Sequence, residues 1–294
     1  MNLDTAIDTF LSPIADKISG IIFSSVTIHG VKIEFLVALL MIAGFYFTFR
    51  TRFIGIWGFK HAIQLITKNY EHKEIRVKKK KGEVSSFQAL TATISASAGI
   101  GNVAGSAAAV SIGGPGVIFW MILAGFFSMA LKFAEVLLGL KFRKVNPDGT
   151  IAGGPMYYIE GALKNNKYIG KFAPHLSKIY AVCCVFAMIG GWNLFQINAM
   201  TTQITEVTGG DKSFFANQSW LLGLIVAVIT YFTIIGGIKA IGKFTSKVTP
   251  VMCTLYVMTA FAVCLYNIGH VPHTVMMILK EAFEPKAMAG GMFA

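Results

Sequence analysis

Residues 87–116 constrain the fold of this chain more than any other stretch, because they carry no charged side chain and consist mostly of small residues. More than half of them are Gly, Ala, Ser or Thr. In water such a helix would make a poor core, since small side chains bury little apolar area each. In a bilayer small residues let neighbouring helices approach closely, and Gly101, Gly105 and Ala109 recur at i, i+4 and i+8. The stretch therefore predicts a closely packed transmembrane helix.

The centre of this stretch, Ser97 to Asn102, is the part least able to stay helical. Gly99 and Gly101 flank a single residue, and a polar asparagine follows them. Unwound backbone at membrane depth occurs only where protein buries it or where it lines a cavity. Its N–H groups can then bind a carboxylate, and its carbonyls can bind a cation. We therefore predict a helix broken within 97–102, as in secondary transporters.

Composition agrees with a membrane setting, because 54% of the 294 residues are hydrophobic and only 14% are charged. The net charge of +12 could indicate a nucleic-acid partner, but the basic residues lie between apolar runs and are not interleaved with aromatic residues. We therefore expect a lipid bilayer around this chain and no nucleic acid. The four cysteines lie in apolar runs without CxxC spacing or a nearby histidine, which predicts small core residues rather than zinc ligands or a disulfide.

The apolar runs predict an all-α polytopic membrane protein with six spans. These are expected at 33–49, 87–116, 117–140, 178–204, 220–235 and 248–266. Residues 3–18 predict an interfacial amphipathic helix, which together with the first span makes up segment 1–52. Segment 53–84 predicts a basic loop and 85–268 a unit of five helices. Segment 269–294 predicts an outer amphipathic segment that ends as if interrupted.

The basic residues give the expected orientation. With the 53–84 loop in the cytoplasm, twenty of the 26 Lys and Arg residues lie on the inner side, in segments 50–84, 141–178 and 239–247, and five lie outside. This distribution follows the positive-inside rule and places the N-terminus outside. Segment 239–247 is expected to be a short basic loop. The run Lys78 to Lys81 predicts a topogenic loop, with lipid or nucleic-acid binding as alternatives.

Two groups of polar residues fall inside expected spans. Lys132 and Glu135, at i and i+3, predict a structural or gating ion pair rather than a substrate site, because they lie near the inner end of their span. Asn193 and Gln196 share a helical face close to a glycine pair, whereas Asn198 points elsewhere. These amides either hold helices together or line a cavity, and the sequence leaves both readings open.

Several motifs taken in order resemble the alanine or glycine:cation symporter family from about residue 30 to the end. They are Phe87-Gln88-Ala89-Leu90, 99–105 (GIGNVAG), 113–116 (GGPG), Phe119-Trp120-Met121, 132–135 (KFAE), 153–159 (GGPMYYI) and 236–239 (GGIK). The resemblance implies the leucine-transporter fold, with two inverted repeats of five helices, in a prokaryotic inner membrane. It also implies carriage of alanine or glycine inward with sodium, sometimes protons, by a protein that is neither an enzyme nor dependent on an organic cofactor.

The chain departs from the family pattern in one respect. The second repeat of the family bears an Asn-Glu-Ala-Gly motif, which this sequence lacks. The resemblance therefore assigns the second to sixth spans to the first repeat and makes a C-terminal half of the same fold an expected partner. The alternative is a non-transporting or channel-like membrane fragment.

The resemblance and the predicted break together give a set of site residues. Backbone amides at Gly99, Ile100 and Gly101 are expected to bind the substrate carboxylate at a half-helix N-terminus. By similarity to the fold, the expected sodium ligands are the carbonyls of Ser95, Ser97 and Ala98 and the side chain of Asn102. Further candidates for substrate contacts are Gln88, Thr91, Asn193 and Gln196.

A dinucleotide-binding reading of the same glycines is excluded. Gly99-x-Gly101-x-x-Ala104 mimics that fingerprint, which also needs a preceding strand and an acidic residue about twenty positions later. Here an apolar helix is expected before the glycines, and the first acid downstream is Glu135.

Overall fold

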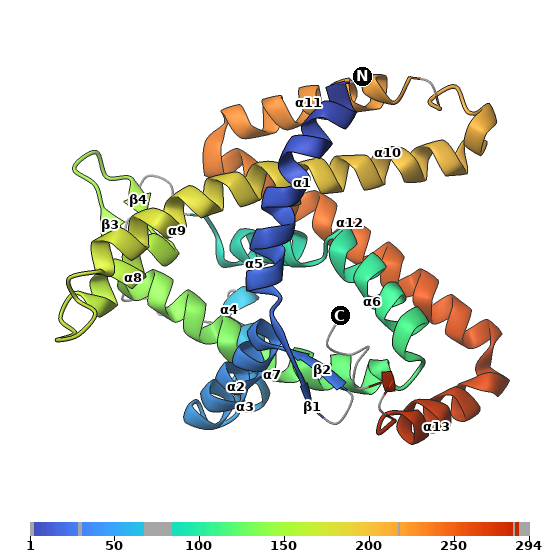
Figure 1. The fold of residues 1–294 in the computed structure, drawn as a ribbon, viewed down its shortest axis with the longest axis horizontal. Helices are drawn as coiled ribbons and strands as arrows, with labels where there is room; N and C mark the ends of the chain where they lie inside the picture. The colour runs from blue at the N-terminus through green and yellow to red at the C-terminus, as the bar shows by residue number, and fades with distance from the viewer. Residues whose placement is uncertain (1–2, 29–30, 68–83, 217, 285, 288–294) are drawn as a thin grey trace. The chain divides into compact units, whose positions relative to one another are not determined.

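The computed structural model describes residues 3–28, 31–67, 84–216, 218–284 and 286–287, and within these ranges the chain is mostly helical. It forms two compact units, which we describe separately. The first unit combines residues 1–59, 104–134 and 264–294, and the second combines 60–103 and 135–263. Figure 1 shows the elements coloured along the chain.

The first unit begins with α1 (Leu3–Ile22), which contains the amphipathic helix expected at 3–18. A short antiparallel hairpin follows, made of β1 (Ser25–Ile28) and β2 (Val31–Glu34), which the all-α prediction did not include. Val26 and Ile28 alternate with polar residues in β1, as Val31 and Ile33 do in β2. This period of two is typical of strands.

The helix α2 (Phe35–Arg50) packs on α7 (Val117–Lys141) inside the first unit. A Cβ built on Gly44 would lie only 3.2 Å from the Phe127 Cβ, and the Phe45 and Phe127 ring centroids are 3.8 Å apart. Glycine at this position therefore allows the close approach of two apolar helices that small residues favour. The short helix α3 (Ile54–Trp57) follows α2.

The corner between α6 (Ile100–Gly113) and α7 carries α13 (Val271–Glu281) in the first unit. The 3₁₀ turn η3 (Ile268–His270) precedes α13. Gly114 has φ +78, and a Cβ on Gly116 would meet the backbone carbon and oxygen of Glu281 at 2.4 Å. The Trp120 indole N–H donates to the Ala282 carbonyl at 2.6 Å. The two glycines thus let the end of α13 lie directly on the turn.

In the second unit, α4 (Phe59–Ile66) is followed, after the undescribed residues 68–83, by α5 (Ser86–Ser97). The prediction of a loop over 53–84 is therefore wrong in its first part, where α3 and α4 form helices. The cause is local: 59–66 has an amphipathic pattern strong enough to form a short helix. The Lys78 to Lys81 run lies outside the described residues.

The inner basic segment that follows the third span begins with a hairpin of β3 (Lys144–Val145) and β4 (Ile151–Ala152). At its turn Asp148 accepts hydrogen bonds from the Thr150 hydroxyl and backbone N–H, which lower the pKa of that carboxyl. Then α8 (Pro155–Leu163) packs against α9 (Ala173–Ala187), with the Ser177 hydroxyl donating to the Met156 carbonyl at 2.8 Å.

A continuous helical run follows, made of α9, the π-helical η1 (Met188–Leu194) and α10 (Phe195–Val207). The 3₁₀ turn η2 (Gly210–Lys212) lies in the connection to α11 (Ser219–Ile235), which packs against α10. Finally α12 (Gly237–Tyr266) begins directly after Gly236. The prediction of a short basic loop at 239–247 is therefore wrong, because these residues form the first turns of α12.

Two of the described helices, α7 and α12, are long and apolar enough to cross a membrane. The apolar helices α2, α6, α9 and α11 are shorter, at 10–17 residues. A 17-residue helix is about 26 Å long, at the lower limit for a span. The cysteines were expected in the core, but Cys183 and Cys264 are exposed, whereas Cys184 and Cys253 are partly buried.

Candidate functional site

The candidate site is the interruption between α5 and α6 in the second unit, which lies inside the 97–102 stretch. The α-helix α5 ends at Ser97 and α6 begins at Ile100. The Ala98 N–H still donates to the Ile94 carbonyl at 2.7 Å, but Ala98 leaves helical geometry at φ −89 and ψ 54. Two glycines and a serine favour this break, because each is a weaker helix former than alanine. A break exposes backbone carbonyls at the end of one half-helix and N–H groups at the start of the next.

The side chain of Gln196 on α10 satisfies one of these backbone N–H groups. Its Oε1 accepts a hydrogen bond from the Ile100 N–H at 3.4 Å, across 96 positions of sequence. This distance is long for an N–H···O bond, so the interaction is weak. The absence of a side chain at Gly99 permits it, since a Cβ there would lie 2.8 Å from the Gln196 Nε2. An amide oxygen thus occupies the position in front of the first N–H of α6.

A second hydrogen bond spans the break, from the start of α6 to the end of α5. The Asn102 Nδ2 donates a short hydrogen bond to the Ser97 carbonyl, so the structure brings these two predicted sodium ligands together. Asn102 also bonds through its backbone N–H to the Gly99 carbonyl at 3.1 Å, which tightens the first turn of α6. Ser95 and Ala98, the other two predicted ligands, are exposed. The break therefore gathers carbonyl oxygens and one amide side chain within a few residues.

Gln88 and Thr91 are not brought to the break. Gln88 forms a capping box with Ser85, in which its Oε1 accepts from the Ser85 N–H at 3.0 Å and its N–H donates to the Ser85 hydroxyl at 3.2 Å. The Thr91 hydroxyl donates to the Phe87 carbonyl at 3.0 Å, and its side chain is buried. Eight residues separate Thr91 from Gly99, which is roughly 12 Å along a helix. The Ser-x-x-Gln pattern at the start of α5 was a sequence signal for the first of these roles.

Asn193 and Gln196 take different environments, although the sequence placed them on one face. Gln196 is half-buried at the break, whereas Asn193 is exposed in η1. A π-helical stretch bonds i to i+5 and so changes the register of the residues within it. The face predicted from α-helical spacing therefore does not continue through η1.

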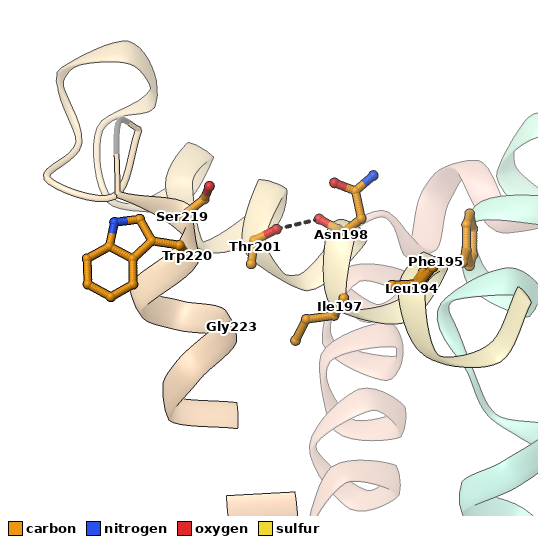
Figure 2. A pocket seen from close by; sticks show the side chains of 8 residues that line it. All are labelled: Leu194, Phe195, Ile197, Asn198, Thr201, Ser219, Trp220 and Gly223. Carbon is orange, nitrogen blue, oxygen red and sulfur yellow. Dashed lines mark hydrogen bonds between the residues drawn. The ribbon is translucent and has the colours of Figure 1, made fainter. Parts of the chain in front are cut away.

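A pocket of about 610 Å³ lies between α10 and α11, in the second unit (Figure 2). It is lined by Leu194, Phe195, Ile197, Asn198, Thr201, Ser219, Trp220 and Gly223. Its volume suits a small ligand or part of a lipid. The sequence analysis missed it, and its only signal was Asn198, which pointed away from the face of Gln196. Gln196 is not among the lining residues.

The charged pair of α7 shows a further contact. Burial raises the pKa of the Tyr158 phenol on α8, and the nearby negative charges of Glu135 and then Tyr180 raise it further. Glu135 therefore lies close to Tyr158, outside the broken helix. The structural or gating role of Lys132 and Glu135 stays a prediction.

The profile of the sodium:alanine symporter family matches residues 19–294. A sodium/alanine symporter of Methanococcus maripaludis is 34% identical over 258 residues, which cover 88% of this chain and 53% of the relative. An uncharacterized transporter of Haemophilus influenzae is 37% identical over 257 residues, covering 87% and 52%. A probable sodium/glutamine symporter of Bacillus subtilis is 31% identical over 258 residues, covering 88% and 49%. The chain spans about half the length of the curated relatives that it matches.

Proposed function

The chain belongs to the sodium:alanine symporter family, and from this premise we propose that it is the part of a secondary transporter that carries alanine or glycine into the cell with a sodium ion. The second to sixth spans form the first repeat of a leucine-transporter fold in this proposal. The N-terminus lies outside an inner membrane and the 53–84 loop lies in the cytoplasm.

The observation that carries the proposal is the hydrogen bond from the Ile100 N–H to the Gln196 Oε1 at 3.4 Å. The first N–H groups of a helix, with the positive end of its dipole, favour an anion. An amino-acid carboxylate is a stronger acceptor than a neutral amide oxygen. The substrate carboxylate displaces the Gln196 oxygen and accepts from Ile100 and its neighbours Gly99 and Gly101.

The cation takes the oxygen atoms on the other side of the break. Sodium is a hard cation that prefers oxygen ligands, as calcium and magnesium do. The carbonyls of Ser95, Ser97 and Ala98 supply three oxygens. Asn102 supplies a fourth once its amide turns, so that Oδ1 instead of Nδ2 faces the Ser97 carbonyl. Four oxygen atoms within a few residues suit a hard cation, so sodium is the coupling ion in this proposal.

The substrate is small in this proposal. A Cβ on Gly99 would already meet Gln196, so the space in front of Ile100 is narrow. Relatives carry names for alanine and for glutamine transport, and the narrow space favours alanine or glycine for this chain. Three other candidates take no part in the first contact with the carboxylate: Asn193, which is exposed in η1, and Gln88 and Thr91, which lie about three and two turns before Gly99.

Because the relatives are about twice as long, we propose that a C-terminal half of the same fold completes the site. Each backbone group left unsatisfied in hydrocarbon costs several kcal/mol, so the exposed residues near the break, Ser95 and Ala98 among them, need such a partner. Among the described residues, a Cβ built on Gly101 or Gly105 meets no atom within 4 Å, which leaves room for neighbouring helices.

The test is uptake of labelled alanine by proteoliposomes under an inward sodium gradient. Residues 1–294 are reconstituted alone and together with the C-terminal half of the Methanococcus maripaludis symporter, with assembly checked by co-purification. We expect sodium-dependent uptake only from the assembled halves. Uptake by 1–294 alone would show that the site is complete without a second half. Assembled halves that conduct ions without saturable alanine uptake would favour the channel-like alternative.

A further inference from the structure

The helix α12 is longer than a membrane span requires. Its thirty residues, Gly237–Tyr266, form one helix of about 45 Å, whereas a hydrocarbon core is roughly 30 Å thick. The apolar part, residues 248–266, is about 28 Å long and fills that core by itself. Residues 237–247 continue the same helix instead of forming a loop (Figure 1). They therefore extend beyond the length that spans a hydrocarbon core.

The lysines of this extension share one face. Lys239, Lys243 and Lys247 recur at i, i+4 and i+8, about 6 Å apart along the axis, and all three are exposed. A neighbouring side of the helix packs on the start of α5, where a Cβ built on Gly242 would lie 3.4 Å from Val84 and 3.5 Å from Gln88. Gly242 lies about 100° around the helix from Lys243, so α5 packs beside the lysine face and does not cover it.

The lysine face differs from two other lysines of this chain, which lie over aromatic rings. Lys141 lies 5.7 Å from the centre of the Phe142 ring, and Lys144 lies 5.5 Å from that of Tyr157. By contrast, no acidic side chain or aromatic ring within the described ranges 3–28, 31–67, 84–216, 218–284 and 286–287 pairs with the three lysines of α12. As far as the described residues go, their charges are therefore open to a partner.

We propose that the lysine face of α12, defined by Lys239, Lys243 and Lys247, binds the phosphate groups of anionic phospholipids. The partner is a lipid because the face continues the apolar part of the same helix and so meets the headgroups of the lipids that surround it. Basic residues next to a transmembrane helix attract an anionic surface by about 1 kcal/mol each, which is about fivefold in affinity per lysine. This inference stands independently of transport.

The test is native mass spectrometry of purified 1–294 in detergent with a mixture of phosphatidylglycerol and phosphatidylcholine. One variant carries Lys239→Gln, Lys243→Gln and Lys247→Gln. The matched control carries Lys164→Gln, Lys167→Gln and Lys171→Gln, which removes the same charge from three other exposed lysines on the same expected side of the membrane. Because all six lysines are exposed, both variants should keep the thermal stability of the parent chain.

We expect the parent to retain phosphatidylglycerol preferentially, the α12 variant to lose that preference, and the control to keep it. Each single substitution on α12 should lower the affinity roughly fivefold, which supports the assignment if the triple variant is poorly folded. An equal loss in both triple variants would mean a response to net charge only and would overturn the proposal. So would equally tight retention of inorganic phosphate or of a short DNA oligonucleotide, which would indicate a site for soluble polyanions.

Discussion

Replacing Gly99 by alanine tests the contact on which the candidate site rests. The added Cβ would lie 2.8 Å from the Gln196 Nε2 and 3.8 Å from its Cδ. Carbon and nitrogen atoms pack at roughly 3.5 Å, so the amide must retreat by about half an ångström or more. The Ile100 N···Gln196 Oε1 distance is already 3.4 Å, at the limit of a hydrogen bond, and this retreat breaks it.

The stability of the chain should hardly change. Losing one hydrogen bond costs about 1 kcal/mol, while alanine in place of glycine next to two helices contributes up to about 1 kcal/mol of helix propensity. The two effects offset each other in the free energy of unfolding. The Ile100 amide, however, loses its acceptor, so its hydrogen exchange should become about fivefold faster, as expected for about 1 kcal/mol of protection.

The assay is hydrogen exchange of purified 1–294, resolved by mass spectrometry for the peptide around the break, with thermal unfolding measured in parallel. Gly101→Ala is the matched control, because it makes the same chemical change one residue beyond Ile100, and within the described part of the chain a Cβ there meets nothing within 4 Å. It should raise stability and leave the Ile100 exchange no faster. Unchanged exchange in Gly99→Ala, or equal acceleration in both variants, would refute the role given to Gln196.

Three further predictions concern other parts of the chain. Asn102→Ala, in the assembled halves, should weaken sodium affinity more than alanine affinity, because it removes a cation oxygen and leaves the amides at Ile100; alanine affinity lost at saturating sodium would count against the assignment. A single cysteine replacing Lys80 should resist a membrane-impermeant thiol reagent in intact cells, since twenty inner positive charges place that loop in the cytoplasm; ready labelling would reverse the orientation. Gly116→Ala should destabilise the chain by about 1 to 3 kcal/mol through overpacking, because its Cβ would meet the backbone of Glu281 at 2.4 Å. Gly125→Ala, whose Cβ meets no described atom within 4 Å, should not, and equal melting temperatures would contradict the docking of α13 on the turn.

Features that depend on local chemistry were accessible from the sequence. The glycine pair around Ile100 indicated a break, and α5 ends at Ser97 while α6 begins at Ile100. The Gly-Gly-Pro-Gly turn needs a residue with positive φ, and Gly114 takes φ +78. Such features follow from backbone preference within a few residues, with little influence from the rest of the fold.

Two further features had local signals that the sequence analysis did not use. The lysines at 239, 243 and 247 have helical spacing, and α12 begins at Gly237 instead of after a loop. The Ser85 and Gln88 capping box engages a side chain that the resemblance assigned to substrate. In both cases a charged or polar residue was interpreted by its function before its place in a helix was considered.

The remaining features depend on contacts that the sequence does not reveal. Gln196 reaches Ile100 across 96 positions, and only the packing of α10 against the break creates that hydrogen bond. The π-helical stretch Met188–Leu194 then separates Asn193 from Gln196, although their spacing in an ordinary helix would join them. The pocket between α10 and α11 likewise arises from the pairing of two helices, and no residue pattern within either helix predicts it.

The central claim is that the amino-acid carboxylate binds at the Ile100 amide. The most direct measurement is a solid-state NMR dipolar recoupling experiment on the assembled halves in membranes, with alanine labelled with ¹³C at the carboxyl carbon and isoleucine labelled with ¹⁵N. We predict that the bound carboxyl signal is dephased by an isoleucine nitrogen within hydrogen-bonding range, and that this dephasing disappears in an Ile100→Leu variant that still binds alanine. Saturated binding without dephasing, or dephasing that persists in Ile100→Leu, would contradict the account.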